Sequence, residues 1–244
     1  MIKSTSTSMS TRTYTPIAGA AAKKHLQGLL DSVRAPAQYR QHMTALGKLL
    51  GACAMPLLLS KGLSHATSQQ TLIISTAEDA DFLQHGVSEV LQDNHIPFKL
   101  AVFWNHHYQL PNQSSVAPIV HKFIEAGYEH ATNIMMVKSV MSGSCVVRTN
   151  LIEMIGDMPN VEHIYILAPV AHMQSEVKLK AEFPTSISDK FQFICFAIDD
   201  NRSQSGDVIP GIGGQVYELL GLNDQPVLAA YMPKVVEKLA FAGM

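Results

Sequence analysis

Cysteine is scarce in this sequence: only Cys53, Cys145 and Cys195 occur among its 244 residues. An odd number of widely spaced cysteines is not typical of a secreted scaffold held by disulfides, so we expect a reducing, cytoplasmic location. The sequence also has no Cys-x-x-Cys pair, which argues against a zinc ribbon.

Long hydrophobic runs and an excess of one charge are missing too. The longest apolar stretch, residues 49–59, is interrupted by Pro56 and is shorter than the roughly 18 residues that span a bilayer, so we expect a buried helix and no membrane partner. With 18 basic and 20 acidic residues the formal net charge is -2, which indicates no nucleic-acid partner. A hydrophobic content of 47% is enough for one large core.

The first 13 residues are almost all serine, threonine and methionine, and they lack the apolar region of a secretory signal. No acidic residue precedes Asp31, as in an organelle transit peptide, but only Arg12 and Arg34 supply arginine up to that region. We therefore expect a disordered tail over residues 1–13 and a single domain over residues 14–244.

Hydrophobic spacing predicts the order of helices and strands. Residues 18–62 are helical in pattern and divided at Pro36, which can open the second helix. Further along, short continuous apolar runs predict strands at 72–74, 98–104, 134–137, 164–167 and 191–198. Helices are predicted at 81–92, 146–155, 172–183, 216–221 and 227–242, and a loop or hairpin at 105–115. This alternation predicts a single α/β domain with a mostly parallel central sheet of four or five strands and helices on both faces.

In open parallel sheets, ligands bind beyond the carboxyl ends of the strands. One such loop combines small residues and a glycine between a predicted strand and a predicted helix, so its backbone N–H groups can hold an anion. The candidate phosphate-binding residues are Ser142, Gly143, Ser144 and Cys145, with Lys138 adding positive charge. The alternative is that Ser144 only caps the helix.

Several segments, in this order along the chain, resemble uracil phosphoribosyltransferases. They are Tyr39-Arg40 followed by Leu46-Gly-Lys-Leu-Leu50, then Ala168-Pro169, Ala197-Ile198-Asp199, and Gly-Asp-Val-Ile-Pro-Gly-Ile-Gly at 206–213. The resemblance covers about residues 26–222. It implies a type I phosphoribosyltransferase fold, a homodimer, possible use of Mg²⁺ and a place in pyrimidine salvage. It also implies base-binding residues, namely Val208, Ile209, Pro210, Gly211, Ile212 and Gly213.

The sequence departs from the resembled family where charge matters. Lys138 stands where the family has an acidic residue that holds the ribose, and Gly214-Gln215 replaces a glycine-aspartate pair. Where the family has an arginine that meets pyrophosphate, this chain has three carboxylates, Glu78, Asp79 and Asp81. These carboxylates either face a Mg²⁺ ion or cap the helix that follows them.

Two functions therefore remain open. One is a uracil phosphoribosyltransferase, which converts base and phosphoribosyl pyrophosphate to nucleoside monophosphate and pyrophosphate. The other is a catalytically inactive homologue that binds a nucleobase, a nucleotide or a protein partner. The altered charges favour the second and the retained loops favour the first, and no catalytic residue is assigned.

Three further candidates carry chemistry of their own. Cys145, at a predicted helix N-terminus, could be a nucleophile with a lowered pKa. Asp199-Asp200 could hold magnesium or ribose, or form a solvated turn. A metal site could form from three histidines, His106, His107 and His121. The side chains of the adjacent His106 and His107 are expected to point in different directions.

Overall fold

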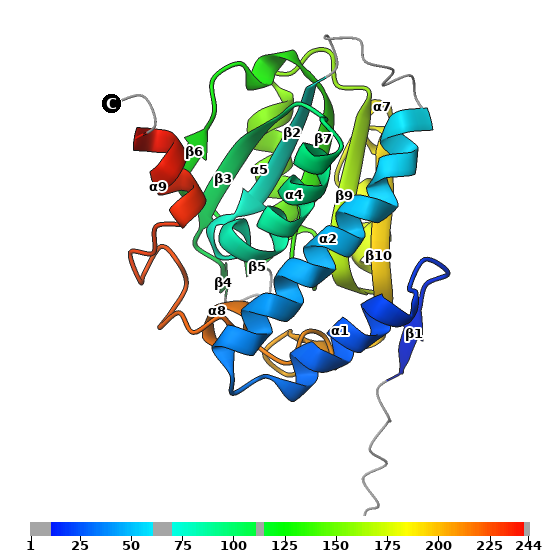
Figure 1. Ribbon diagram of the computed structural model, residues 1–244, viewed down its shortest axis with the longest axis vertical. Helices are drawn as coiled ribbons and strands as arrows, with labels where there is room; N and C mark the ends of the chain where they lie inside the picture. Colours follow the sequence, from blue (N-terminus) through cyan, green and yellow to red (C-terminus); the bar gives the residue numbers. More distant parts are fainter. Residues whose placement is uncertain (1–10, 61–69, 111–114, 242–244) are drawn as a thin grey trace, which may run out of the picture.

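The computed structural model describes residues 11–60, 70–110 and 115–241, which form one α/β domain around an eight-stranded sheet (Figure 1). The strand order is β1-β10-β9-β7-β2-β3-β6, with β8 beside β9. The strands are β1 (Arg12–Tyr14), β2 (Gln70–Thr76), β3 (Phe98–Asn105), β6 (Ile119–Ile124), β7 (Ala131–Val137), β8 (Val140–Met141), β9 (His163–His172) and β10 (Phe191–Asp199). The strands β10, β9, β7, β2 and β3 run parallel, and β1 and β6 are antiparallel edges. The predicted mostly parallel sheet is confirmed.

Helices cover both faces of this sheet, as predicted. The longer ones are α1 (Ala20–Asp31), α2 (Pro36–Ser60), α4 (His85–Asp93), α5 (Cys145–Ile155), α6 (Ser175–Ala181) and α9 (Lys234–Phe241). The short elements are α3 (Ala77–Asp79), η1 (Ala80–Gln84), β4 (Tyr108–Gln109), β5 (Ser115–Val116), η2 (Tyr128–His130), α7 (Thr185–Ser188), β11 (Asn201–Arg202), β12 (Val208–Ile209) and α8 (Val216–Leu219). Helices α1, α2 and α4 lie on one face of the sheet and α5 lies on the other (Figure 1).

The two helical layers explain why the strands are apolar on both sides. Ile73 of β2 belongs to the core beneath α1, α2 and α4, whereas its neighbours Leu72 and Ile74 belong to the core that contains α5 and α6. Side chains alternate along a strand, so a sheet covered on both faces buries every residue. Continuous apolar runs in the sequence follow from this arrangement.

Helix α2 packs very closely on the segment η1–α4. A Cβ atom at Gly47 would lie 2.0 Å from the Leu83 carbonyl oxygen, and one at Gly86 would lie 2.2 Å from the Thr44 carbonyl oxygen. Both positions therefore require glycine. By length and composition α2 could cross a membrane, but its Leu46 and Leu50 are fully buried in the core of the domain. Soluble core helices meet the same criterion.

The structure differs from the predicted elements in three places. Residues 1–10 of the predicted tail lie outside the described residues, but Arg12 and Thr13 pair with β10 as strand β1. Strand β6 was not predicted, because its residues lie at the sheet edge and show no buried alternation. The helix predicted from residue 172 begins at Ser175, because β9 continues through His172. In the segment 105–115, predicted as a loop or hairpin, β4 pairs antiparallel with β5, and residues 111–114 lie outside the described residues.

Two histidines connect α1 to α2. The Nδ1 atoms of His25 and His42 lie 3.0 Å apart, a hydrogen bond in which one ring nitrogen donates and the other must be an unprotonated acceptor. Burial, and then the proximity of His42 and Lys24, lower the pKa of His25 from its ordinary value of 6.5. The contact therefore depends on a neutral imidazole.

We expect the free energy of unfolding to decrease as the pH falls below about 6.5. The unfolded chain protonates His25 at a higher pH than the folded protein does, so the stabilisation is present above the unfolded pKa and is lost on acidification. His25→Gln should reduce the pH dependence of thermal unfolding between about pH 7.5 and about pH 5. His130→Gln, at an exposed ring, is the matched control. Equal pH dependence in all three proteins would contradict this role of His25.

Candidate functional site

A cavity of about 970 Å³ lies at the carboxyl ends of the parallel strands. It brings together most of the candidate residues, since its lining includes Lys138, Ser142, Gly143, Ser144, Cys145, Val208 and Ile212. The other candidates of the 208–213 loop are not part of the lining; they are Ile209, Pro210, Gly211 and Gly213. Two loops about 60 residues apart in the sequence thus meet at the edge of the sheet where ligands bind in such folds.

The residues 142–145, here called the phosphate loop, connect β8 to α5. Ser144 is the N-cap residue, but its side chain makes no capping hydrogen bond, so the structure does not support the interpretation of Ser144 as only a cap. A Cβ atom at Gly143 would meet no other atom within 4 Å. The phosphate loop and the following Val146 and Val147 all line the cavity, so the first turn of α5 is at the cavity surface.

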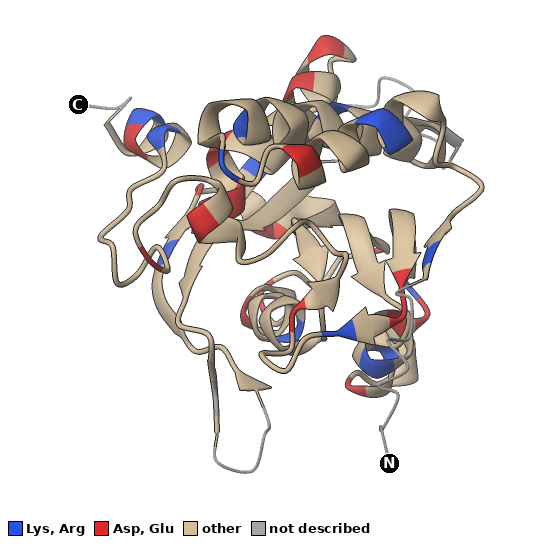
Figure 2. Cartoon of the chain, turned by 90° about the horizontal axis from the view of Figure 1, so that it is seen from below, with Lys and Arg blue, Asp and Glu red and all other residues tan. Residues whose placement is uncertain are grey.

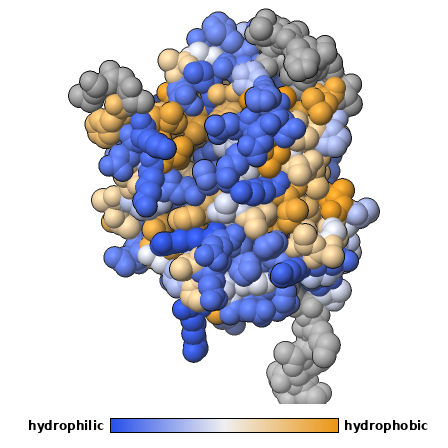
Figure 3. All heavy atoms as spheres, viewed as in Figure 1, coloured by the Kyte–Doolittle hydropathy of each residue, from blue (hydrophilic) through white to orange (hydrophobic). Residues whose placement is uncertain are grey.

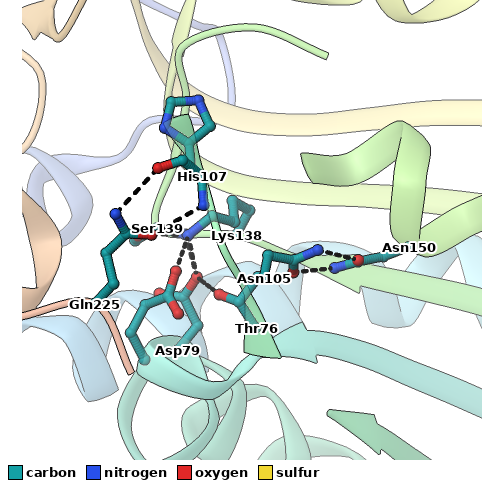
Figure 4. A network of polar contacts seen from close by, with 9 residues as sticks. Thr76, Asp79, Asn105, His107, Lys138, Ser139, Asn150 and Gln225 are labelled. Atoms are coloured by element: carbon teal, nitrogen blue, oxygen red, sulfur yellow. Dashed lines mark hydrogen bonds and ion pairs between the residues drawn. The ribbon is translucent and has the colours of Figure 1, made fainter. Parts of the chain in front are cut away.

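Lys138 lies in a buried cluster of three charges, here called the ion cluster (Figure 4). Its Nζ atom is 2.8 Å from Oδ2 of Asp79 and 3.0 Å from Oε1 of Glu78. Oδ2 of Asp79 also accepts hydrogen bonds from the Thr76 hydroxyl at 3.0 Å and from the Ser139 amide at 3.2 Å. The ion cluster therefore joins the loop after β2 to the loop after β7.

The electrostatics of the ion cluster determine what Lys138 can do. Burial by itself would lower the pKa of Lys138, but the carboxylates of Asp79 and Glu78 raise it above its ordinary value. The lysine is therefore charged and already paired with two anions. Lys138 is not a free cation for a phosphate, which is the role that the sequence suggested.

Glu78, Asp79 and Asp81 lie in the first turns of α3 and η1, as the alternative to a magnesium site required, but none of them makes a capping hydrogen bond there. Asp79 is in the ion cluster, and neither α3 nor η1 has a side-chain cap. Asp81 instead accepts hydrogen bonds from the backbone amides of Lys234 and Val235 at 2.8 and 3.0 Å, and from the Tyr231 hydroxyl at 2.9 Å. It therefore caps α9, which begins at Lys234, just after Pro233, and not at residue 227 as predicted.

A second buried ion pair holds the 208–213 loop. Asp199 is fully buried, pairs with Arg12 at 2.7 Å and accepts a hydrogen bond from the Gly211 amide at 2.8 Å. Arg12 also donates to the Gly211 carbonyl, and the Tyr39 hydroxyl donates to the Ile212 carbonyl at 3.0 Å. Asp199 is thus an internal anchor and not a ligand, whereas Asp200 is exposed just after β10, which agrees with the solvated turn considered for the pair.

His107 lines the cavity near the ion cluster. Its backbone amide donates to Oε1 of Gln225 at 2.9 Å, and its carbonyl accepts from Nε2 of Gln225 at 3.0 Å (Figure 4). Burial, and then Lys138, lower the pKa of His107. Within the described residues, no three side chains of His, Cys, Asp or Glu form a metal site, so His106, His107 and His121 are not such a group.

The thiol of Cys145 is not activated. Its Sγ atom donates to the Ser115 carbonyl at 3.2 Å, and burial raises the pKa of the thiol. The hypothesis of a nucleophile with a lowered pKa is therefore wrong.

The sequence analysis missed the cavity wall that follows β9 and β10. This wall includes Gln174 and Lys178 near the start of α6, and Arg202 in β11. All three positions follow the carboxyl ends of strands, and this position in the sequence is the signal that could have identified them as cavity residues. Basic and acidic residues are intermixed along the described part of the chain, so composition did not single them out (Figure 2).

The fold and the cavity define a single-domain α/β protein with its candidate site at the strand ends. No family model and no curated protein matches the sequence. Among solved structures, the chain is similar to the AQ2163 protein from Aquifex aeolicus, with a TM-score of 0.61 and 11% identity over 82% of this chain and 94% of that chain. This likeness shows a common fold.

Two hypoxanthine phosphoribosyltransferases are also similar. The enzyme from Trypanosoma cruzi, as a mutant form complexed with the product IMP, has a TM-score of 0.42 and 10% identity over 66% of this chain and 74% of that chain. The hypoxanthine-guanine enzyme from L. donovani has a TM-score of 0.45 and 8% identity over 72% of this chain and 90% of that chain. Scores of this size do not by themselves establish a common function.

We expect Lys138→Met to lower the free energy of unfolding by about 3–5 kcal/mol, because two buried carboxylates lose their cation. The variant Glu78→Gln, Asp79→Asn and Lys138→Met, which removes all three charges, should be less destabilised than Lys138→Met alone. Denaturant unfolding measures both. Lys122→Met, at an exposed ion pair with Glu153, is the control and should change little. A Lys138→Met protein as stable as that control would contradict the structural role of the ion cluster.

Proposed function

We propose that this protein is a phosphoribosyltransferase-like module that binds a nucleoside monophosphate, with uridine monophosphate as the first candidate, and that its transferase activity is weak or absent. The observation that carries the proposal is the ion cluster. It places Glu78 and an already paired Lys138 in the cavity wall beside an open phosphate loop.

The phosphate side of the cavity supports nucleotide binding. The first turn of α5 is free of a side-chain cap and lines the cavity. Backbone N–H groups at a helix N-terminus favour phosphate through hydrogen bonds and the helix dipole. The cavity volume of about 970 Å³ is at the upper end of the range for small-molecule sites.

The pyrophosphate side supports weak or absent transfer. Displacement of pyrophosphate from an anomeric carbon needs cations that hold the leaving group as the transition state forms. The resemblance implies an arginine there, but this chain supplies Glu78 in the cavity wall, with Asp79 buried behind it, and these two carboxylates outnumber their partner Lys138. A like charge at about 4 Å opposes a polyanion by about 1–4 kcal/mol.

Glu78, Asp79 and Asp199, three of the carboxylates that the sequence suggested for a magnesium ion, are already engaged by protein groups. Glu78 and Asp79 are engaged by Lys138, and Asp199 is engaged by Arg12 and Gly211. No step of the proposed function therefore uses a metal ion bound by these side chains.

We expect uridine monophosphate to bind more tightly than phosphoribosyl pyrophosphate in metal-free calorimetry, because only the latter faces Glu78. Gly143→Leu should abolish the binding, since its side chain meets no protein atom near Cβ and blocks the approach of phosphate to the backbone. Gly156→Leu, at the far end of α5 and equally free of neighbours, is the matched control. Equal or tighter binding of phosphoribosyl pyrophosphate would refute the proposal.

A second assay separates binding from transfer. Labelled uracil with phosphoribosyl pyrophosphate and Mg²⁺ should give little or no uridine monophosphate. Turnover of about 1 per second or faster, as in ordinary enzymes, would instead identify an active transferase. A protein that binds no nucleotide in the first assay would favour the alternative of a protein-interaction module.

A cytoplasmic homodimer is part of the proposal, as the resemblance implies. Many apolar side chains of α2 fill the core, but Leu59 is 52% exposed. Small groups of hydrophobic residues are also exposed on the face that carries α1, α2 and α4 (Figure 3). Sedimentation should show a dimer that Leu59→Glu weakens. A strict monomer at about 1 µM protein would contradict it, since stable dimers persist at such concentrations.

A further inference from the structure

Four lysine and arginine side chains line the cavity within the described residues, and two of them have protein partners. Lys138 is held by Glu78 and Asp79, and Arg148 lies 3.6 Å from Glu182. Lys178 and Arg202 line the same cavity, and neither forms an ion pair with any carboxylate of the described residues. These two residues are called the cation wall below.

The cation wall adjoins the phosphate loop. Lys178 belongs to α6, whose first residue Ser175 donates from its hydroxyl to the Met141 carbonyl at 2.7 Å. Met141 is the residue just before the phosphate loop. Arg202 lies in β11, and the loops after β9 and β10 are joined by a hydrogen bond from the Met173 amide to the Asp199 carbonyl at 3.0 Å. Three neighbouring strand ends thus place the cation wall beside α5.

Glu182 and Asp207 line the same cavity, but no carboxylate of the described residues forms an ion pair with Lys178 or Arg202. Burial lowers the pKa of Arg202, and no carboxylate offsets that effect. His172 lies behind the wall with 6% exposure, and its Nδ1 atom accepts a hydrogen bond from the Gln174 amide at 3.1 Å. Burial, then Arg202, and to a smaller degree Lys178 lower the pKa of His172, against the carbonyl and charge of Asp200. The N–H donors of Lys178 and Arg202 are therefore not engaged by a described carboxylate and can bind an anion in the cavity.

We propose that Lys178 and Arg202 bind the phosphate group of the ligand and neutralise its charge. Lys138 does not do so, because it is paired with Glu78 and Asp79. This inference rests on the proposed nucleotide function and names the side chains that complete its phosphate site. The guanidinium group can make two parallel hydrogen bonds to a phosphate, while the lysine adds a point charge. Two cations match a phosphate dianion, whose second pKa is about 6.

The test is calorimetry of the full chain at low salt with uridine monophosphate, uridine and inorganic pyrophosphate as probes. Lys178→Ala and Arg202→Ala should each weaken uridine monophosphate binding about tenfold or more, because each loses a charge-assisted contact. Both residues are exposed, so the variants should unfold at the wild-type temperature. Lys180→Ala is the matched control, since Lys180 is on the same helix but pairs with Glu176 at 2.7 Å. Uridine, which has no phosphate, should bind all four proteins equally.

The outcomes distinguish a failure of the cation wall from a failure of the nucleotide function. If wild-type protein binds uridine monophosphate and the Lys178 and Arg202 variants bind it equally well, the cation wall is overturned and the nucleotide function stands. If wild-type protein binds no uridine monophosphate but binds pyrophosphate in a manner lost in both variants, the anion site stands and the nucleotide function fails. If wild-type protein binds none of these anions, both ideas fail.

Discussion

The carboxylate of Asp79 is the constraint on which the rest of the site depends. It is almost completely buried, and a buried anion must be paired and hydrogen-bonded if the fold is to be stable. Lys138, Thr76 and the Ser139 amide all contact its Oδ2 atom from the ends of β2 and β7, whereas the buried Oδ1 atom has no hydrogen-bond partner among the described residues. Because these contacts fix both loops, they also fix the position at which β8 and the phosphate loop begin.

The second buried pair, Arg12 with Asp199, fixes the 208–213 loop on the other side of the cavity. It ties the edge strand β1 and the end of β10 to Gly211, and Tyr39 of α2 completes the support at Ile212. Both pairs sit where parallel strands end, because that is where the chain leaves the apolar sheet and polar groups become available. The cavity is therefore framed by internal ion pairs, and its free charge is limited to a few side chains.

The distribution of charge in the cavity differs from that of the resembled family at the two loops where phosphate would bind and pyrophosphate would leave. The resembled family has a basic loop after the first parallel strand and an acidic residue near the phosphate loop, whereas this chain has acidic residues in the first place and Lys138 in the second. In this chain Lys138 and the two carboxylates attract each other and join the two loops. On our proposal, no cation remains to hold a leaving pyrophosphate, while the first turn of α5 and the cation wall bind a single phosphate.

The sequence by itself determined the parallel sheet, its two helical layers and the start of α2 at Pro36. Those features follow from local periodicity and from proline geometry, which act over a few residues. It also indicated the loops that meet at the cavity, because parallel strands place their carboxyl ends at one edge. Only the tertiary structure decided that Lys138 pairs with Asp79, that Asp81 caps α9, and that Arg12 reaches Asp199. These partners are 59 to 187 residues apart, and periodicity carries no information about which distant charges meet when burial forces each of them to find a counterion.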